Sequence, residues 1–87
     1  KIPVHPHSSM TGVNQAASIH LLAAIENGGT FEADLSKGNL FRDVMGSEPW
    51  CIGKDGNVLP LDAPGIGVEI DEEFLKAHPA IEGPGYV

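Results

Sequence analysis

His7 and Glu32 are the two residues of this chain whose types and positions best suit them to chemistry. His7 follows a proline and precedes two serines, and imidazole is the side chain best suited to proton transfer near neutral pH. Glu32 comes 25 residues later in an otherwise apolar stretch, where a carboxylate needs a partner or a ligand. The residues alone also allow a structural loop histidine, and a solvated glutamate that shares a polar face with Asp34.

The elements that must position these two residues form a strand, a loop, a helix and a second strand. Residues 2–5 are a short β-rich run, and apolar residues recur at spacings of three and four over 12–26, as in an amphipathic helix. Residues 30–35 alternate apolar and acidic side chains, as in a half-buried strand. This order is a βαβ unit, which places His7 and Glu32 at the same end of two parallel strands. In an α/β barrel, that end is the catalytic one.

Capping residues mark where the helices should begin and end. Ser8, Ser9 and Thr11 are candidate N-caps for the first helix, and Asn27-Gly28-Gly29 is typical of a helix end. Asp71 is the expected N-cap of a second helix over 72–78, with Glu72 and Glu73 suited to the positive end of its dipole.

Beyond residue 36 the pattern becomes a series of short elements. The expected order is one or two helical turns at 39–45, a hairpin with arms 49–52 and 58–61 around a turn at 54–57, a strand at 68–70, the helix at 72–78 and a surface tail at 79–87. We expect the chain to be the C-terminal piece of a longer protein, because so short a βαβ unit leaves sheet edges and a helix face uncovered.

Composition excludes several classes of function. The 87 residues are 41% apolar, too high for a disordered segment, and no apolar run approaches the ~20 residues of a membrane span. The net charge is −7, with no basic patch for a phosphate backbone, so neither nucleic acid nor a membrane is an expected partner. Cys51 is the only cysteine, which excludes an internal disulfide and favours a reduced, cytoplasmic location.

Two rival interpretations follow from the same residues. His5 and His7, at i and i+2, lie on one face of a strand and could begin the metal site of a barrel hydrolase. That site needs further ligands, for which His20 and His78 are poorly placed, one within a helix and the other near the tail. The second rival is a non-catalytic acidic interaction module in which His7 and Glu32 only stabilise loops.

The order and spacing of several motifs resemble the C-terminal part of the enolase superfamily. Within this superfamily, the chain resembles the mandelate racemase/muconate lactonizing enzyme family. Within that family, it resembles the mandelate racemase-like branch. It extends over nearly the whole chain and rests on Pro6-His7-Ser8-Ser9, Ala17-Ser18-Ile19-His20-Leu21-Leu22-Ala23-Ala24, Phe31-Glu32-Ala33-Asp34, Asn39-Leu40-Phe41-Arg42-Asp43 and Pro64-Gly65-Ile66-Gly67-Val68-Glu69-Ile70-Asp71.

This resemblance implies an α/β fold, the C-terminal fragment of a (β/α)8 TIM-like barrel. Residues 1–36 would be strand seven, helix seven and strand eight, the last βαβ unit of the barrel. Residues 37–87, with the hairpin, short strand, short helix and tail, would complete the capping region against an N-terminal capping domain. The expected partners are the rest of the barrel, the capping domain, a small carboxylate substrate and further copies in a homo-oligomer.

The resemblance also implies a reaction. His7 would pair with an aspartate from strand six and move the substrate proton, and Glu32 would hydrogen-bond the substrate carboxylate. Ser8 and Ser9 are predicted substrate-binding residues. The chemistry is abstraction of the proton α to a carboxylate, giving an enediolate held by Mg²⁺, whose ligands are expected upstream of this chain.

Among the reactions of this family, dehydration of an acid sugar or hydroxy acid is favoured over racemisation or epimerisation. The reason is the Pro-His pair, which the acid-sugar dehydratases commonly carry at this point. The 87 residues alone are not expected to be active, because the resemblance implies that the Mg²⁺ ligands, a strand-two lysine and the aspartate partner of His7 would lie upstream of them.

Overall fold

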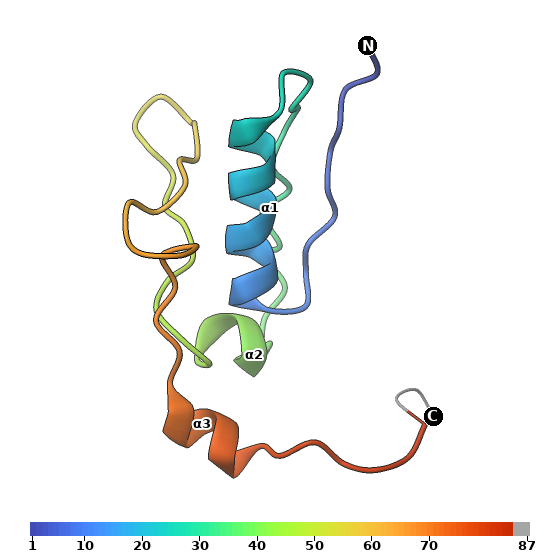
Figure 1. Ribbon diagram of the computed structural model, residues 1–87, viewed down its shortest axis with the longest axis vertical. Helices are drawn as coiled ribbons and strands as arrows, with labels where there is room; N and C mark the ends of the chain where they lie inside the picture. The colour runs from blue at the N-terminus through green and yellow to red at the C-terminus, as the bar shows by residue number, and fades with distance from the viewer. Residues whose placement is uncertain (85–87) are drawn as a thin grey trace.

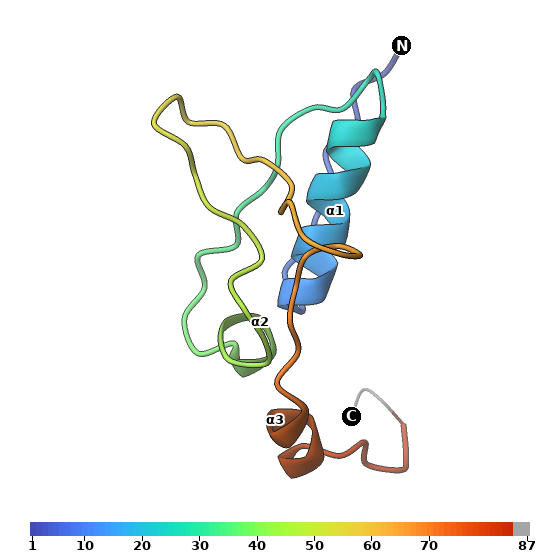
Figure 2. The ribbon, with the colours of Figure 1, turned by 60° about the vertical axis from the view of Figure 1, so that its left-hand side comes forward.

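The computed structural model describes residues 1–84, which contain three helices joined by long irregular segments. In chain order these are α1 (Gly12–Ala24), α2 (Leu40–Asp43) and α3 (Glu72–Ala77). Figure 1 shows α1 at the centre, with the N-terminal segment along one side and the segments that follow α2 along the other. In Figure 2 the segment after α1 returns past that helix, so that α2 lies near the N-terminal end of α1. The predicted tail at 79–87 ends in residues 85–87, which lie outside the described residues.

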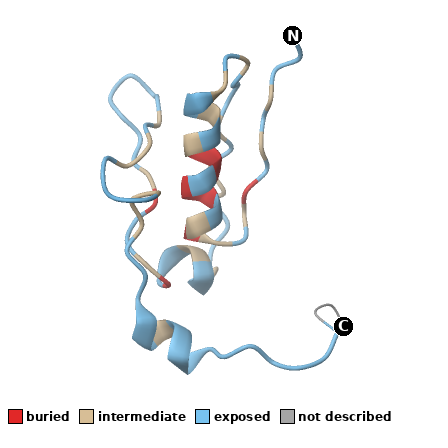
Figure 3. Ribbon diagram, in the orientation of Figure 1, coloured by how far each residue is buried: buried red, intermediate tan, exposed pale blue. Residues whose placement is uncertain are grey.

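The helix α1 begins and ends where its capping residues predict. Of the three candidate N-caps, Thr11 is the one that caps: its Oγ1 accepts from the backbone N–H of Asn14 at 3.0 Å. At the other end, the N–H of Ile25 donates to the carbonyl of Leu21. The buried face of α1 mixes small, apolar and polar side chains: Gly12, Gln15, Ala16, Ser18 and Ile19. Figure 3 shows the buried positions of α1 in red, among other positions of the helix that are intermediate or exposed.

The strands predicted at 2–5 and 30–35 are not formed as continuous strands. A single parallel bridge, Val4–Gly28, joins the two segments, so their parallel direction is as predicted but the bridge falls before the predicted second strand. The predicted inward face of 30–35 is also only partly correct, because Phe31 is half-buried whereas Leu35 is exposed.

The ladder stops after one bridge because its next positions cannot continue it. The backbone bonds of the bridge run from Val4 N–H to Asn27 O and from Gly29 N–H to Val4 O, each 2.9 Å. The next bond of a parallel ladder needs an N–H two residues after Val4, and that residue is Pro6. The N–H of Thr30, just beyond the bridge, donates instead to a side chain, as described below.

The second part of the chain contains the predicted short helices and the predicted turn, but not extended hairpin arms. Asn39 caps α2 and Asp71 caps α3, each through its side-chain oxygen. The turn at 53–57 closes on one antiparallel bridge, Ile52–Val58, and a further antiparallel bridge joins Gly46 to Ile70. The helices α2 and α3 meet through aromatic rings: Phe41 lies edge-on to Phe74, with ring centroids 5.5 Å apart.

The apolar core within residues 1–84 is small. Its buried members are Ala16, Ile19 and Met45, whereas several large apolar side chains are exposed: Ile2, Leu35, Leu59 and Ile81. None of the helices in this part of the chain has the length and apolar character needed to cross a lipid bilayer. Polar contacts therefore provide many of the links between the segments, and those contacts define the candidate site.

Candidate active site

His7 and Glu32, predicted from the sequence as the reactive pair, are in direct contact. Nδ1 of His7 lies 3.0 Å from Oε2 of Glu32, although the residues come from segments on opposite sides of α1 in the sequence. Both side chains are open to solvent, with 72% and 61% of their surfaces exposed. A carboxylate accepts hydrogen bonds, so this contact fixes the proton on Nδ1. The geometry brings the pair together, and their roles in a reaction remain predictions.

The contact changes the acidity of His7. The hydrogen bond to Glu32 and then the charge of that carboxylate raise the pKa of His7 above its ordinary value, and the charge of Asp34 adds to the rise. Desolvation works in the opposite direction. The protonated imidazolium therefore persists to higher pH than in an unperturbed histidine, which suits a group that donates a proton.

The two serines that follow His7 have different surroundings. Oγ of Ser9 lies 3.3 Å from Nε2 of His7, so the imidazole is contacted at both nitrogens, by Glu32 on one side and Ser9 on the other. Ser8 is only 3% exposed, and its hydroxyl bonds that of Ser18 on α1. Ser9 thus joins the His7–Glu32 pair, whereas Ser8 anchors the loop to α1; substrate contact by either serine remains a prediction.

His5 has a structural place beside this pair. Its Nδ1 accepts from the backbone N–H of Thr30 at 2.9 Å and lies 3.0 Å from Thr30 Oγ1. The ring lies so close to Gly29 that a Cβ at that position would be 2.2 Å from the ring carbon Cε1. A side chain at this position would therefore displace the imidazole from its contact with Thr30. The geometry does not favour the rival interpretation of His5 and His7 as a metal pair, because Nδ1 of His5 accepts from Thr30 and Nδ1 of His7 faces Glu32.

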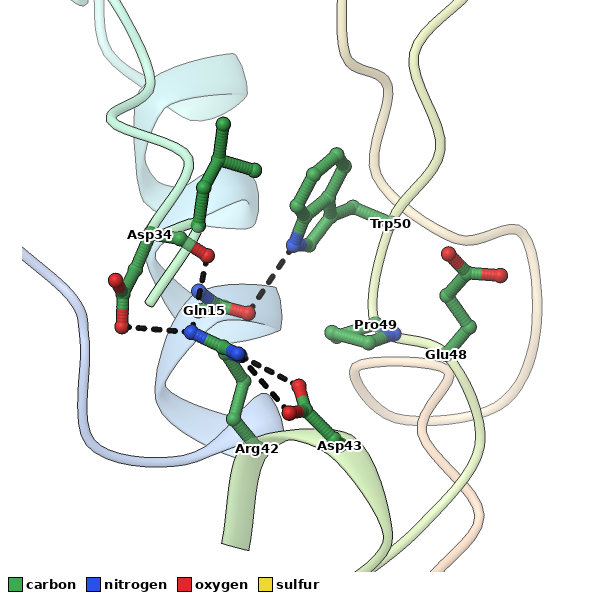
Figure 4. A pocket seen from close by; sticks show the side chains of 8 residues that line it. Gln15, Asp34, Arg42, Asp43, Glu48, Pro49 and Trp50 are labelled. Carbon is green, nitrogen blue, oxygen red and sulfur yellow. Dashed lines mark hydrogen bonds and ion pairs between the residues drawn. The ribbon is translucent and has the colours of Figure 1, made fainter. Parts of the chain in front are cut away.

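The sequence did not predict a second group of polar residues, which is centred on Arg42. Arg42 lies between two carboxylates, with its side chain 9% exposed; NH1 is 2.8 Å from Asp34 Oδ2, and Nε is 2.6 Å from Asp43 Oδ1 (Figure 4). The pKa of Asp34 is lowered by the N–H and then the hydroxyl of Ser36, with a smaller contribution from the charge of Arg42. The only signal in the sequence was Asn39 three residues before Arg42, an N-cap pattern that predicts a helical turn but not the contacts of the guanidinium.

The same group lines a pocket of about 440 Å³. Its walls include Gln15, Arg42, Glu48 and Trp50, and neither His7 nor Glu32 is among the described residues that line it. Gln15 is fully buried, and its Oε1 accepts from Trp50 Nε1 at 3.1 Å (Figure 4). Within the described residues, Nε2 of Gln15 has no hydrogen-bond partner. The pocket and the His7–Glu32 pair are therefore different features, joined through the segment 32–34.

Comparison with known proteins places the chain in a family. A family model described as enolase C-terminal domain-like matches residues 1–74. The chain belongs to this family and corresponds to the C-terminal part of enolase superfamily proteins.

Two relatives show the extent of the similarity. A D-galactonate dehydratase family member from Enterococcus gallinarum (strain EG2) is 38% identical over 76 residues, which cover 86% of this chain and 18% of that protein. The crystal structure of a member of the enolase superfamily from Polaromonas sp. JS666 is similar with a TM-score of 0.78 and 56% identity, over 98% of this chain and 22% of that one. The chain thus spans about a fifth of the length of these relatives.

Enzymes of this superfamily generally use Mg²⁺. A hard cation of this kind takes several oxygen ligands together. In residues 1–84, no group of three or more His, Cys, Asp or Glu side chains is placed to hold a metal ion. Glu32 is engaged with His7, and Asp34 with Arg42. The described residues therefore do not form a Mg²⁺ site by themselves.

Proposed function

We propose that this chain carries part of the active site of an enolase-superfamily enzyme that dehydrates an acid sugar or a related hydroxy acid. The observation that carries the proposal is the 3.0 Å contact between His7 Nδ1 and Glu32 Oε2, made by residues from two separate segments. The similarity to a D-galactonate dehydratase family member supports the class of substrate. Mg²⁺ belongs to this proposal as the metal of the family, held by residues outside this chain.

In the proposed reaction, His7 acts as the proton donor. A base from outside this chain would take the proton α to the carboxylate and leave an enediolate. Dehydration then requires the β C–O bond to break as the departing hydroxyl gains a proton from His7 and leaves as water. Because Glu32 holds the proton on Nδ1, the transferable proton is that on Nε2 of the imidazolium. The raised pKa of His7 extends its protonated form to higher pH than for an unperturbed histidine, which supports a role as proton donor.

Glu32 has the second role in the proposal, as a contact of the substrate carboxylate. A carboxylate beside another carboxylate is repulsive unless a positive charge or a shared proton intervenes. The imidazolium of His7 supplies that charge at 3.0 Å. The serine next to it in space, Ser9, is placed to hydrogen-bond either the imidazole or a substrate hydroxyl.

The proposal includes an architecture for the complete protein. Residues 1–36 would supply the last βαβ unit of a (β/α)8 barrel, and residues 37–87 would complete its capping region. The single parallel bridge Val4–Gly28 and the α1 helix between its two sides support the first assignment. The exposed apolar side chains, Ile2 and Leu59 among them, are the kind of surface that a further layer of protein covers.

The test is a screen of the complete protein, with Mg²⁺, against a panel of acid sugars and hydroxy acids. Formation of a keto acid product would be followed, together with exchange of the α-proton in D₂O. We expect dehydration of at least one substrate, and we expect His7→Asn to lower turnover by about 10²–10⁴-fold without unfolding the protein. His78→Asn is the matched control, because that histidine stacks on Phe74 of α3.

The outcomes distinguish the alternatives. Activity of His7→Asn within a few-fold of the parent would show that His7 is not the proton-transfer residue. Exchange of the α-proton with configuration change but no loss of water would identify a racemase or epimerase instead. Zn²⁺-dependent hydrolysis that is lost in His5→Ala would identify the hydrolase, whereas the proposed reaction predicts that His5→Ala acts only through the position of Thr30.

A further inference from the structure

The loops that carry His7 and Glu32 need an anchor beyond the backbone ladder. The ladder between their segments consists of one bridge, Val4–Gly28, and it ends before either residue is reached. The contact between two exposed side chains gives little stability by itself, because each must be held in one conformation. Contacts from α2 and its N-cap reach both loops.

Asn39, the N-cap of α2, binds the loop that follows His7. Its Nδ2 donates to the carbonyl of Ser9 at 2.7 Å and lies 3.1 Å from the carbonyl of Met10. Its Oδ1 accepts from the N–H of Arg42 at 3.2 Å, which caps the helix. One half-buried amide thus uses its acceptor to begin α2 and its donors to hold the backbone just beyond His7.

Arg42, one turn further along α2, binds the loop that follows Glu32. Its NH1 donates to the carbonyl of Asp34 at 3.0 Å and to Ser36 Oγ at 3.0 Å, and NH2 donates to the carbonyl of Ser36. The same guanidinium pairs with the Asp34 carboxylate at 2.8 Å. The guanidinium has five N–H donors in a planar, forked arrangement and can bond all of these acceptors. The ammonium group of a lysine cannot. Figure 4 shows the guanidinium between Asp34 and Asp43.

Asn39 and Arg42 each bind the backbone at the same distance in sequence from a member of the His7–Glu32 pair. Asn39 holds the carbonyl two residues after His7, and Arg42 holds the carbonyl two residues after Glu32. Both belong to one helical turn, so the separation of the loops follows the geometry of that turn.

We propose that Asn39 and Arg42 are positioning residues, which set the distance between His7 and Glu32 through the backbone of their loops. The inference rests on the proposed function for its kinetic consequences. Neither side chain touches the substrate in this proposal. Their effect on the reaction is indirect, through the 3.0 Å contact between Nδ1 and Oε2. A displacement of about 1 Å at a site of this kind can cost as much as 10²-fold in rate.

The first test separates the two tasks of Asn39 in the complete enzyme. In Asn39→Ser the hydroxyl retains N-capping ability, but it is too short to donate to the carbonyls of Ser9 and Met10. We expect kcat to fall about tenfold, because the His7 loop is released, while KM changes little. Asp71→Ser is the matched control: it makes the same kind of replacement at the cap of α3, whose bond is to Phe74 N–H, and we expect parental kinetics.

The pH dependence of kcat adds a measurement that a purely structural role would not move. The charged groups that act on His7 are Glu32 and, more weakly, Asp34, and Asn39→Ser leaves both unchanged. A looser His7–Glu32 contact lowers the pKa of His7 toward its ordinary value. Because the proposed donor must be protonated, activity is lost as the pH rises through this pKa, so the alkaline limb moves to lower pH in Asn39→Ser.

The second test concerns the Glu32 loop. Arg42→Lys keeps the positive charge between Asp34 and Asp43 but loses the fork that reaches the carbonyls. Since Glu32 is the proposed contact of the substrate carboxylate, we expect KM to rise about tenfold. Lys76→Met, which breaks only the exposed pair with Glu73, is the control and should keep the parental KM. If Arg42→Lys does not fold, Asp34→Asn tests the same anchor by removing its ion pair.

Two results would overturn the proposal. One is parental kcat, KM and pH profile in both folded variants. The other is a loss of activity that follows the loss of melting temperature, with the alkaline limb unmoved, which would make the anchors merely structural. The pKa of His7, measured by NMR with ¹³C-labelled histidine in parent and variants, keeps this test separate from the proposed function. If no substrate is turned over, an unchanged pKa in Asn39→Ser still refutes positioning, and a lowered one still supports it.

Discussion

Two ion pairs lie on the same short segment, and they differ in almost every physical respect. The outer pair, His7–Glu32, is mostly exposed, with 72% and 61% of the side-chain surfaces open to solvent. The inner pair, Arg42–Asp34, is largely covered, at 9% and 18%, and the guanidinium makes further bonds to the carbonyls of residues 34 and 36. Only one residue separates Glu32 from Asp34 in the sequence.

This difference indicates that Glu32 and Asp34 have different roles. The exposed pair can exchange its partner for a substrate at small cost, because its groups remain solvated when the contact opens. The covered pair cannot open in the same way, since separation would leave a carboxylate and a guanidinium without their partners. Asp34 therefore holds the segment in place, and Glu32 remains available for the proposed substrate contact.

Breaking the inner pair should give the largest change in stability. Arg42→Met removes the positive charge between Asp34 and Asp43 together with the donors to two carbonyls. We expect the melting temperature of the complete protein to fall by several degrees. The exposed Lys76–Glu73 pair is the reference: Lys76→Met should change the free energy of unfolding by no more than about 0.5 kcal/mol. Equal effects of the two substitutions would remove the distinction between a covered pair and an exposed one.

Much of the local structure could be predicted from the sequence, because it depends on nearby residues. Thr11 and Asp71 cap their helices as N-cap chemistry predicts, and glycines follow the end of α1. The proximity of His7 and Glu32 could also be predicted. A helix that connects two parallel segments brings the C-terminal ends of both segments to the same side. Enolase superfamily membership is confirmed by the family match over residues 1–74.

The strands and the anchors could not be predicted, because each depends on contacts that no local pattern encodes. The run at 2–5 has strand character, yet Pro6 lacks the N–H that would extend the ladder, and His5 captures the N–H of Thr30. Asp34 was expected on a solvated face with Glu32, but the guanidinium of Arg42 covers it. That contact joins residues from separate elements, and the sequence alone indicated only a helical turn around Arg42.

An intermediate effect is expected from the hydroxyl that supports Asp34 from the other side. Both the N–H and the hydroxyl of Ser36 bond the Asp34 carboxylate at 2.9 Å, and they are the main causes of its lowered pKa. A lowered carboxyl pKa stabilises the fold above the unfolded-state value of 3.8, and this contribution is lost as the pH falls through the folded-state value. In Ser36→Ala the pKa of Asp34 rises, so acid unfolding should begin at a higher pH. An unchanged acid midpoint would mean that the N–H of residue 36 and Arg42 hold Asp34 without help from the hydroxyl.

The smallest change in stability is expected from breaking the outer pair. Glu32→Gln removes the negative charge beside His7 but keeps an oxygen that accepts from Nδ1. A raised histidine pKa stabilises the fold below the unfolded-state value of 6.5 and loses that contribution as the pH rises through the folded-state value. Because the pair is exposed, the melting temperature of Glu32→Gln should stay close to the parental one at pH 6 and pH 8, while NMR shows the pKa of His7 falling toward 6.5. A marked loss of stability at pH 6 would show that the outer pair also holds the fold, and it would no longer be free to exchange its partner for a substrate.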